Sequence, residues 1–113
     1  MILAKVLHRL RPNSLWKIHG DFTIEGIEWL DENQSQPSRE EIEAEWAVVE
    51  NEVEAKKVRK ERDFLLTESD WVTIRALETG NPVPDEWKEY RQQLRNVPQQ
   101  NGFPMEIVWP EKP

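Results

Sequence analysis

The sequence predicts an α+β fold: a small α-β-β-α unit, followed by short helices and an extended segment rich in proline and tryptophan. Three observations support this prediction. Apolar residues recur at helical spacing near the N-terminus, alternate in the segment that follows, and return to helical spacing in the middle of the chain. Toward the C-terminus, prolines divide the chain into short pieces. We expect two parts, an N-terminal domain over residues 1–66 and a C-terminal segment over residues 67–113.

The first predicted element is a short amphipathic helix over residues 2–10, and Pro12 blocks its continuation. Its apolar face consists of Ile2, Leu3, Val6, Leu7 and Leu10. A strand over residues 15–18 follows, and Gly20-Asp21 suits a two-residue hairpin turn. We expect a second strand with a bulge at Glu25-Gly26, because one inserted residue would bring the apolar side chains on either side of it to the same face. Those side chains are Phe22, Ile24, Ile27 and Trp29.

A long helix is predicted over about residues 38–66. Ser38 and Glu41 form a capping box, in which each side chain bonds a free backbone amide at the helix start. The helix then carries an apolar stripe of Ile42, Trp46, Val49 and Val53. Beyond Val53 the stripe thins to Ala55 and Val58. The last turns, through Asp63, are therefore expected either to project into water or to lie against a partner helix.

Two short helices are predicted over about residues 67–78 and 85–96. Thr67 and Asp70 predict a weak cap for the first, which ends before Gly80, and Asp85 is expected to cap the second, which Pro98 ends. The first has a face of Trp71, Ile74 and Leu77, and the second gathers Trp87, Tyr90, Arg91 and Leu94. The closing stretch from Phe103 to Pro110 is expected to be extended, suited to lie as an edge strand on a partner.

The composition argues against several classes of function. A net charge of -7 over 113 residues argues against nucleic-acid binding, because phosphate neutralisation requires clustered lysine and arginine. The chain has no cysteine, which excludes disulfides and thiolate chemistry. No apolar run approaches the ~20 residues of a membrane span, and none matches the core of a signal peptide. We expect a cytosolic, soluble chain.

Catalytic and metal-binding patterns are missing from the sequence. His8 and His19 are the only imidazoles, and they fit neither a zinc-binding spacing nor a catalytic triad. The carboxylates lie mainly on the outer face of the long helix, and no glycine-rich phosphate loop is present. We therefore expect no enzyme activity, no metal, no cofactor and no small-molecule substrate.

The aromatic residues indicate more about function than the histidines and carboxylates do. Trp16, Trp29 and Trp46 fall on faces predicted to point inward, which favours a shared core. In the second half, aromatic and aliphatic side chains lie on short elements, where they can pack on each other, on the first half or on another protein. The residues we predict to bind a partner are Trp71, Trp87, Tyr90, Leu94, Phe103, Ile107 and Trp109.

The second half resembles a known family in an ordered set of motifs. The motifs are Arg62-Asp63-Phe64-Leu65-Leu66, Glu68-Ser69-Asp70-Trp71, Pro84-x-x-Trp87-x-x-Tyr90-Arg91-x-x-Leu94-Arg95, Pro98, Phe103-Pro104 and Ile107-x-Trp109-Pro110. This set resembles the C-terminal region of phage tail assembly chaperones and tail-fibre assembly proteins. The first half is similar to the small XkdW-like phage tail proteins, in Leu10-x-Pro12-Asn13-x-x-Trp16, Gly20-Asp21, Ile27-x-Trp29 and Pro37-Ser38-x-x-Glu41-Ile42. That second resemblance implies an α-β-β-α unit.

The resemblance implies a chaperone that binds a tail-fibre or other tail protein in the host cytoplasm while the virion assembles. An alternative is a structural component retained in the virion tail, at the fibre tip or baseplate. A third option, a small regulator of host or phage enzymes, rests only on the acidic composition. Self-association through the stripe of the long helix is also open, although packing on the hairpin explains that stripe better.

Overall fold

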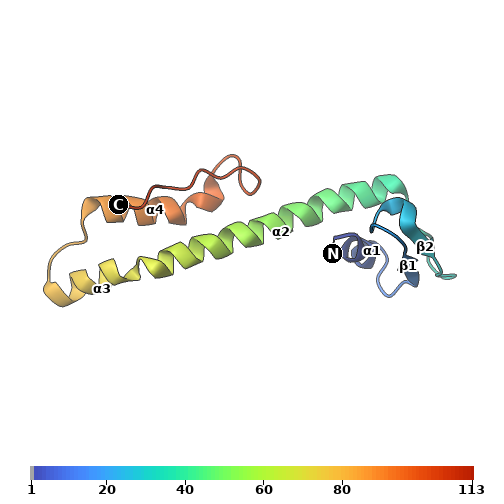
Figure 1. Ribbon diagram of the computed structural model, residues 1–113, viewed down its shortest axis with the longest axis horizontal. Coiled ribbons are helices and arrows are strands. Elements are labelled where there is room, and N and C mark those ends of the chain that lie inside the picture. The colour runs from blue at the N-terminus through green and yellow to red at the C-terminus, as the bar shows by residue number, and fades with distance from the viewer. Residues whose placement is uncertain (1) are drawn as a thin grey trace. The chain divides into compact units, whose positions relative to one another are not determined.

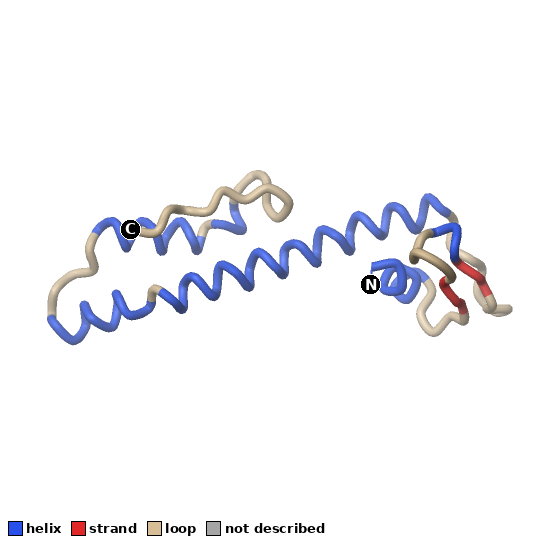
Figure 2. The backbone as a smooth tube through the Cα atoms, viewed as in Figure 1, coloured by secondary structure: helices blue, strands red, loops and turns tan. Residues whose placement is uncertain are grey.

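In the computed structural model, which describes residues 2–113, helices make up most of the chain and the strands form one short hairpin (Figures 1 and 2). The elements are α1 (Ile2–Leu10), β1 (Trp16–Ile18), β2 (Ile27–Trp29), α2 (Arg39–Glu68), α3 (Asp70–Thr79) and α4 (Asp85–Arg95), with short 3-10 turns at Ile24–Gly26 and Val97–Gln99. The predicted α+β fold is confirmed. The chain divides into two compact units, unit 1 (Met1–Glu52) and unit 2 (Val53–Pro113), and the division falls within α2.

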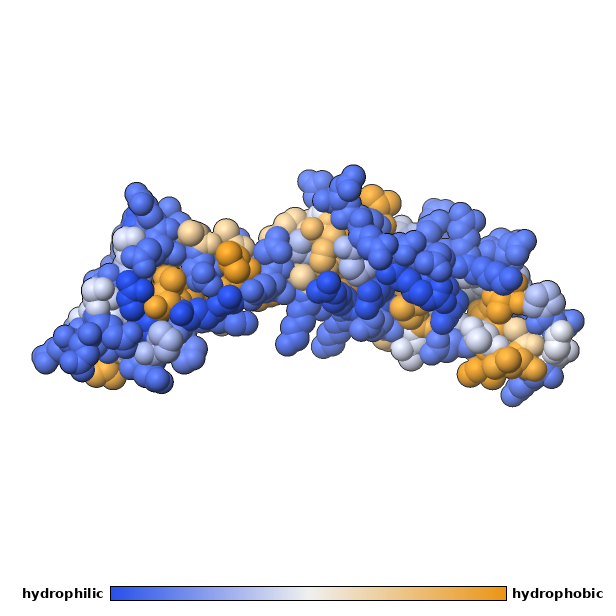
Figure 3. Space-filling view, turned by 180° about the vertical axis from the view of Figure 1, so that it is seen from behind, coloured by the Kyte–Doolittle hydropathy of each residue, from blue (hydrophilic) through white to orange (hydrophobic). Residues whose placement is uncertain are grey.

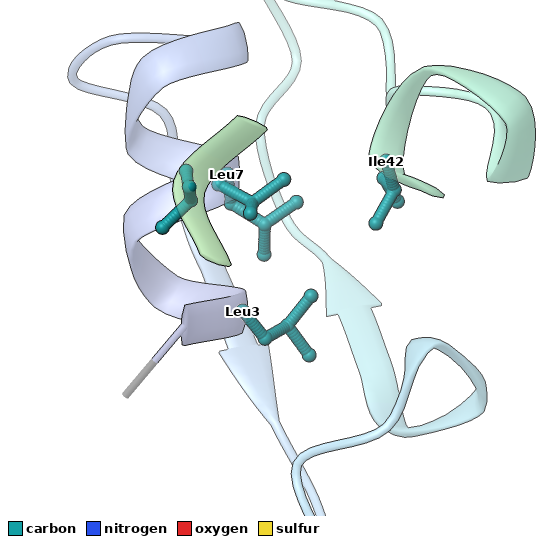
Figure 4. Close-up of a cluster of buried hydrophobic side chains, with 5 residues drawn as sticks. Leu3, Leu7 and Ile42 are labelled. Atoms are coloured by element: carbon teal, nitrogen blue, oxygen red, sulfur yellow. The ribbon is translucent and has the colours of Figure 1, made fainter. Parts of the chain in front are cut away.

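Unit 1 is built around a small aliphatic core. Leu3, Val6 and Leu7 of α1 are fully buried with Ile42 and Val49 of α2. Figure 4 shows Leu3 and Leu7 projecting from α1 into the interior that also receives Ile42. Burial of each such side chain contributes about 1.5–3 kcal/mol. Partly buried residues surround this core: Ile2, Leu10, Trp16, Ile18, Ile24, Ile27, Trp29 and Trp46.

The predicted hairpin is present, but its connection differs from the prediction. The strands pair antiparallel with Trp16 opposite Trp29 and Ile18 opposite Ile27, so residues 19–26 form a long loop. Gly20 has the positive φ (76°) that suits a turn, but the two-residue turn and the second strand beginning at Phe22 were wrong, because Phe22 is also left-handed (φ 60°) and a strand residue is extended.

The predicted bulge at Glu25-Gly26 was also wrong, because a 3-10 turn occupies Ile24–Gly26. It closes the loop where the His19 amide donates to the Gly26 carbonyl oxygen over 2.8 Å. A side chain does not fit here, since a Cβ at Gly26 would lie 2.1 Å from the carbonyl oxygen of His19. The glycine is required by this close approach of two backbones.

The capping box at the start of α2 is confirmed. The Glu41 amide donates to Ser38 Oγ over 3.1 Å, and the Ser38 amide donates to Glu41 Oε1 over 3.3 Å. The Ser38 amide, together with the Arg11 guanidinium, lowers the pKa of Glu41. Further along, Arg9 of α1 pairs with Glu45, at 2.9 Å, and with Glu52. Ion pairs thus border the aliphatic core of unit 1.

Only the first part of the apolar stripe of α2 packs into the core of unit 1. Ile42 and Val49 are buried, Trp46 is half-buried, and Val53 is exposed. Further along, Val58 is buried again, within unit 2. The expectation that the last turns of α2 project into water or meet a partner helix was therefore wrong, because unit 2 itself covers part of them.

In unit 2 the chain passes from α2 to α3 at Ser69, which is 2% exposed. The hydroxyl of Ser69 donates to the carbonyl oxygens of Leu65 and Leu66, over 3.0 and 3.1 Å. The predicted cap by Thr67 and Asp70 was wrong, because a serine hydroxyl bonded back to the preceding turn interrupts the helix instead. α3 begins at Asp70 and ends as predicted before Gly80, which is left-handed (φ 71°).

α4 begins at Asp85 and ends at Arg95, close to the predicted bounds. Asp85 was expected to cap this helix, but it is the first helical residue, and Pro84 occupies the cap position without a side-chain bond. Pro98 lies beyond the helix, in the 3-10 turn Val97–Gln99. The helix buries Tyr90 and Leu94 within unit 2.

Candidate protein-binding surface

Arg91 of α4 holds unit 2 together at the junction of α2 and α3. Its Nη1 donates to the Leu66 carbonyl oxygen over 2.8 Å and to Ser69 Oγ over 2.6 Å, while Nη2 lies 3.0 Å from Asp70 Oδ1. The Arg91 side chain is only 13% exposed. A planar guanidinium suits this task, because its fixed fork of donors bonds several acceptors at once. Arg91 therefore sets the position of α4 against α3.

Three aromatic rings, those of Trp71, Trp87 and Tyr90, pack in series near Arg91. Trp71 and Trp87 lie edge to face with ring centroids 5.4 Å apart, and Trp87 and Tyr90 do the same at 5.8 Å. Tyr90 is buried, Trp87 is half-buried and Trp71 is exposed. The guanidinium of Arg75 lies 5.8 Å from the ring centre of Trp71. The series runs from the interior of unit 2 to its surface and fixes Trp71 there.

α3 presents an apolar face to solvent. We call Trp71, Ile74 and Leu77 the α3 face; Leu77 is 79% exposed and the other two are about half exposed. The predicted helical face exists, but α3 is buried through its other side, at Val72. Figure 3 shows hydrophobic surface at the end of unit 2 that carries α3. Apolar side chains gathered in this way mark interaction sites more often than single exposed residues do.

The C-terminal segment folds back on unit 2. Phe103 lies under the guanidinium of Arg59 at 5.1 Å, and Lys112 pairs with Glu68 at 3.1 Å. The side-chain amide of Gln100 bonds both the N–H and the carbonyl oxygen of Val108, over 2.9 and 2.8 Å. These bonds fasten the segment to its own unit at several points.

The extended conformation predicted for Phe103 to Pro110 was wrong in its first part, because residues 101–106 form turns. The Glu106 amide donates to the Gly102 carbonyl oxygen over 2.8 Å. A Cβ at Gly102 would lie 2.6 Å from the carbonyl oxygen of Glu106, so glycine permits the turn. Only the residues after this turn run without helix or strand. Val108 among them is exposed.

The structure places the seven residues predicted to bind a partner in three classes. Leu94 and Tyr90 are buried, and Trp71 is exposed. The half-buried ones are Trp87, Phe103, Ile107 and Trp109. Their binding role stays a prediction. Exposed apolar residues that the prediction did not include are Phe64, Ile74, Leu77, Met105 and Val108. Phe64 and Trp71 are seven residues apart, but they lie on different helices, α2 and α3, so helical spacing alone does not place them on one face.

Within residues 2–113, no three His, Asp or Glu side chains are grouped so that they could hold a metal ion. His8 is exposed, and His19 Nε2 lies 2.8 Å from a carboxylate oxygen of Glu28. That hydrogen bond from His19 lowers the pKa of Glu28. None of the helices in this part of the chain is long and apolar enough to cross a membrane.

Comparison with known protein families gives a match in the second half of the chain. The sequence model of the phage tail assembly chaperone protein family matches residues 55–113, just over half of the chain and nearly all of unit 2. No curated protein and no solved structure matched the chain. The similarity of the first half to XkdW-like proteins stays a prediction, because the family match begins at residue 55. The match covers the aromatic series, the α3 face and the folded-back C-terminal segment, and the chain belongs to the phage tail assembly chaperone protein family.

Proposed function

We propose that this protein is a non-enzymatic assembly chaperone that binds a tail-fibre or other tail protein through the aromatic and apolar side chains of unit 2. Binding would take place in the host cytoplasm, before the tail protein reaches its place in the virion. The α3 face carries the proposal, because it holds three large apolar side chains in water. A family role in tail assembly supplies the class of partner.

The chemistry of an unassembled tail protein fits such a face. A subunit that will be buried in a larger assembly exposes apolar surface until its neighbours arrive, and that surface favours aggregation. Covering it with the α3 face would remove apolar surface from water on both partners, which stabilises the complex by roughly 25 cal/mol for each Å² buried. The partner can later leave when its permanent neighbours bury the same surface more fully.

The aromatic series supports the α3 face mechanically. Trp87 and Tyr90 hold Trp71 from the interior side, so Trp71 meets a partner with little loss of side-chain freedom. Leu94 of α4 is fully buried, so we propose that it supports the binding surface from inside unit 2 rather than contacting the partner itself. Phe103, Ile107 and Trp109 are proposed to extend the surface along the C-terminal segment. We also propose that residues 67–113 act as the binding segment and that residues 1–66 form an XkdW-like domain.

The proposal is tested by expressing a tail-fibre protein of the same phage with and without this chain. We expect more soluble, correctly assembled fibre when the chain is present. In a binding assay with the same fibre, the double substitution Ile74→Ser, Leu77→Ser should weaken binding by about 2 kcal/mol, because both side chains lie in the proposed contact. The neighbouring double substitution Thr73→Ser, Glu78→Gln alters the same helix and serves as the control.

Equal fibre yields with and without the chain would contradict the chaperone role. Trp87→Ala and Trp109→Ala test the half-buried members, with an expected loss of about 2 kcal/mol in binding for an anchor residue. If either substitution unfolds unit 2 instead, that residue belongs to the core. Mass spectrometry of purified particles tests the alternative role, because a structural component would be retained in stoichiometric amounts.

A further inference from the structure

Unit 1 carries an open groove of about 580 Å³ between the loop that follows β1 and the first turns of α2. Phe22 and Ile24 line it from the loop, and Trp46 and Ala47 line it from the helix. Ile24 and Trp46 also pack against the core of unit 1, so the floor of the groove continues that core to the surface. The groove lies wholly within unit 1 and is separate from the α3 face.

Phe22 is held in an unfavourable backbone conformation at the edge of this groove. Its φ of 60° is left-handed, which for a bulky residue is rare and costs on the order of 1 kcal/mol or more. The ring is 51% exposed, so it gains only about half of the stabilisation that full burial would give. Asparagine or glycine would fit the same backbone with less strain. A ring that is half in water at the edge of a groove would gain apolar contact if a partner covered it.

The rim of the groove is acidic. Asp21 and Glu25 lie on the loop side, and Glu43 and Glu50 lie on the helix side. Arg39 pairs with two of them, Glu25 and Glu43, the latter at 3.5 Å. The groove is therefore lined by more carboxylates than this one guanidinium neutralises. The surroundings add to this excess, because residues 1–52 contain 11 acidic and 5 basic residues, a formal charge of -6 out of the chain's -7.

We propose that this groove binds a short peptide segment of a partner protein that has an apolar centre and lysine or arginine on its flanks. The apolar centre would cover Phe22, Ile24 and Trp46, and the basic flanks would meet the carboxylates of the rim. The acidic field speeds the encounter with such a segment and disfavours acidic ones. This inference does not rest on the α3 face, and it gives unit 1 a recognition role of its own.

The test uses the full chain and a fluorescein-labelled peptide of ten residues, with alternating Leu and Val at its centre and three lysines at each end. Fluorescence anisotropy should show saturable binding that weakens as salt is raised, because the flanks bind through charge. The same peptide with glutamates for lysines should not bind, and a version with serines at the centre should bind much more weakly. Equal binding of the lysine and glutamate peptides, or no binding of the lysine peptide, would overturn the proposal.

Substitutions locate the binding. Phe22→Asn should weaken peptide binding about tenfold while leaving the melting temperature unchanged or raised, because it removes the ring and relieves the backbone. Phe22→Gly repeats the test in case the asparagine variant fails to fold. Glu43→Gln with Glu50→Gln should weaken binding about fivefold at low salt, whereas Glu32→Gln, outside the groove, is the control for an altered charge.

Two results would assign the groove differently and overturn the proposal. One is unchanged peptide binding in both Phe22 variants. The other is concentration-dependent self-association of the chain that Phe22→Asn abolishes, since a second copy would then be the occupant. The double substitution Ile74→Ser, Leu77→Ser should leave peptide binding intact, so failure of this inference is distinguishable from failure of the α3 face.

Discussion

Units 1 and 2 bury similar numbers of apolar side chains but hold them by different means. Unit 1 buries Leu3, Val6, Leu7, Ile42 and Val49, and unit 2 buries Val58, Val72, Tyr90, Leu94 and Val97. In unit 1 these residues form one aliphatic cluster. In unit 2 the buried residues come from the second half of α2, from α3 and α4, and from the turn after α4, and the Arg91 guanidinium bonds backbone and side-chain oxygens at the junction of α2 and α3. Unit 2 therefore contains a nearly buried charged side chain among its helices, where hydrogen bonds are stronger than they would be in water.

The two units also differ in charge. Residues 53–113 contain 10 basic and 11 acidic residues, which nearly cancel, whereas residues 1–52 are strongly acidic. Unit 2 exposes its large apolar residues on the nearly neutral part of the chain. A net charge of -6 in unit 1 favours an approaching basic group over an acidic one, whereas the near-zero net charge of unit 2 discriminates little between them.

The largest expected loss of stability comes from a cavity in the core of unit 1. Leu7→Ala removes a fully buried side chain and should lower the free energy of unfolding of unit 1 by about 3 kcal/mol, because a cavity remains. The indole N–H signals in NMR spectra report each unit separately, since Trp16, Trp29 and Trp46 belong to unit 1 and the other three tryptophans to unit 2. Urea titrations followed by these signals measure the effect.

The unit 1 signals of the Leu7→Ala variant should be lost at lower urea concentration, with the unit 2 signals unchanged. Leu15→Ala, at an exposed leucine of the same unit, is the matched control and should shift stability by less than about 0.5 kcal/mol. Equal loss of both sets of signals in the Leu7 variant would show that the units unfold together.

A smaller loss of stability is expected when the hydrogen bonds of Arg91 in unit 2 are removed. Arg91→Met should destabilise unit 2 by about 2 kcal/mol, because the Leu66 carbonyl and the Ser69 hydroxyl lose a charged donor in a buried place. Arg91→Lys keeps the charge but not the fork of donors, so it should recover only part of the loss. Urea titrations of the unit 2 indole signals measure both variants. Full recovery by lysine would mean that charge alone holds the junction.

The smallest expected effect is a dependence of unit 1 stability on acid. Hydrogen bonds from Arg9 lower the pKa of Glu52, and backbone amides, first that of Gln34, lower the pKa of Asp31. A carboxyl group with a lowered folded pKa stabilises fully above its unfolded pKa, which is 4.5 for Glu, and this contribution is lost as pH falls through the folded value. Unit 1 should therefore become less stable as pH falls from about 5 toward 3.

Thermal melts of the full chain across this pH range, followed by the unit 1 indole signals, measure the acid effect. Glu52→Gln removes one of the lowered carboxyl groups and should make the dependence less steep, whereas Glu40→Gln on the same helix serves as the control. An identical pH profile for wild type and Glu52→Gln would show that the pair with Arg9 does not contribute.

Several periodic and local signals in the sequence predicted the structure correctly. The spacing of Leu3 and Leu7 placed α1 and its buried face, and Ser38 with Glu41 placed the start of α2, because both signals depend on residues within a few positions of each other. The inward faces of Trp16 and Trp29 followed from alternation in the strands. In unit 2, the end of α3 at Gly80 was found because a left-handed glycine is a local stop signal.

The errors lie where distant contacts decide the local structure. The turn at Phe22 uses a conformation that its side chain disfavours, so no sequence rule would place it there. Ser69 interrupts the helix with the help of Arg91, which is 22 residues away. The turn near Gly102 depends on how Gln100 bonds Val108. The spacing of Trp71, Ile74 and Leu77 predicted a helical face on α3, but it did not predict that α3 is buried through its other side, at Val72.

The contacts of unit 2 also have a consequence for the order in which it folds. The pairs Trp71 with Trp87, Asp70 with Arg91, and Arg59 with Phe103 are nested around the reversal from Gly80 to Pro84. Two prolines restrict that reversal before folding, which reduces the entropy lost on closing it. Because the inner pairs are closer in sequence, they are expected to form first, and the contact of Arg59 with Phe103 is expected to form after them. During synthesis, the aromatic series would then be complete before the C-terminal segment folds back to cover its part of α2.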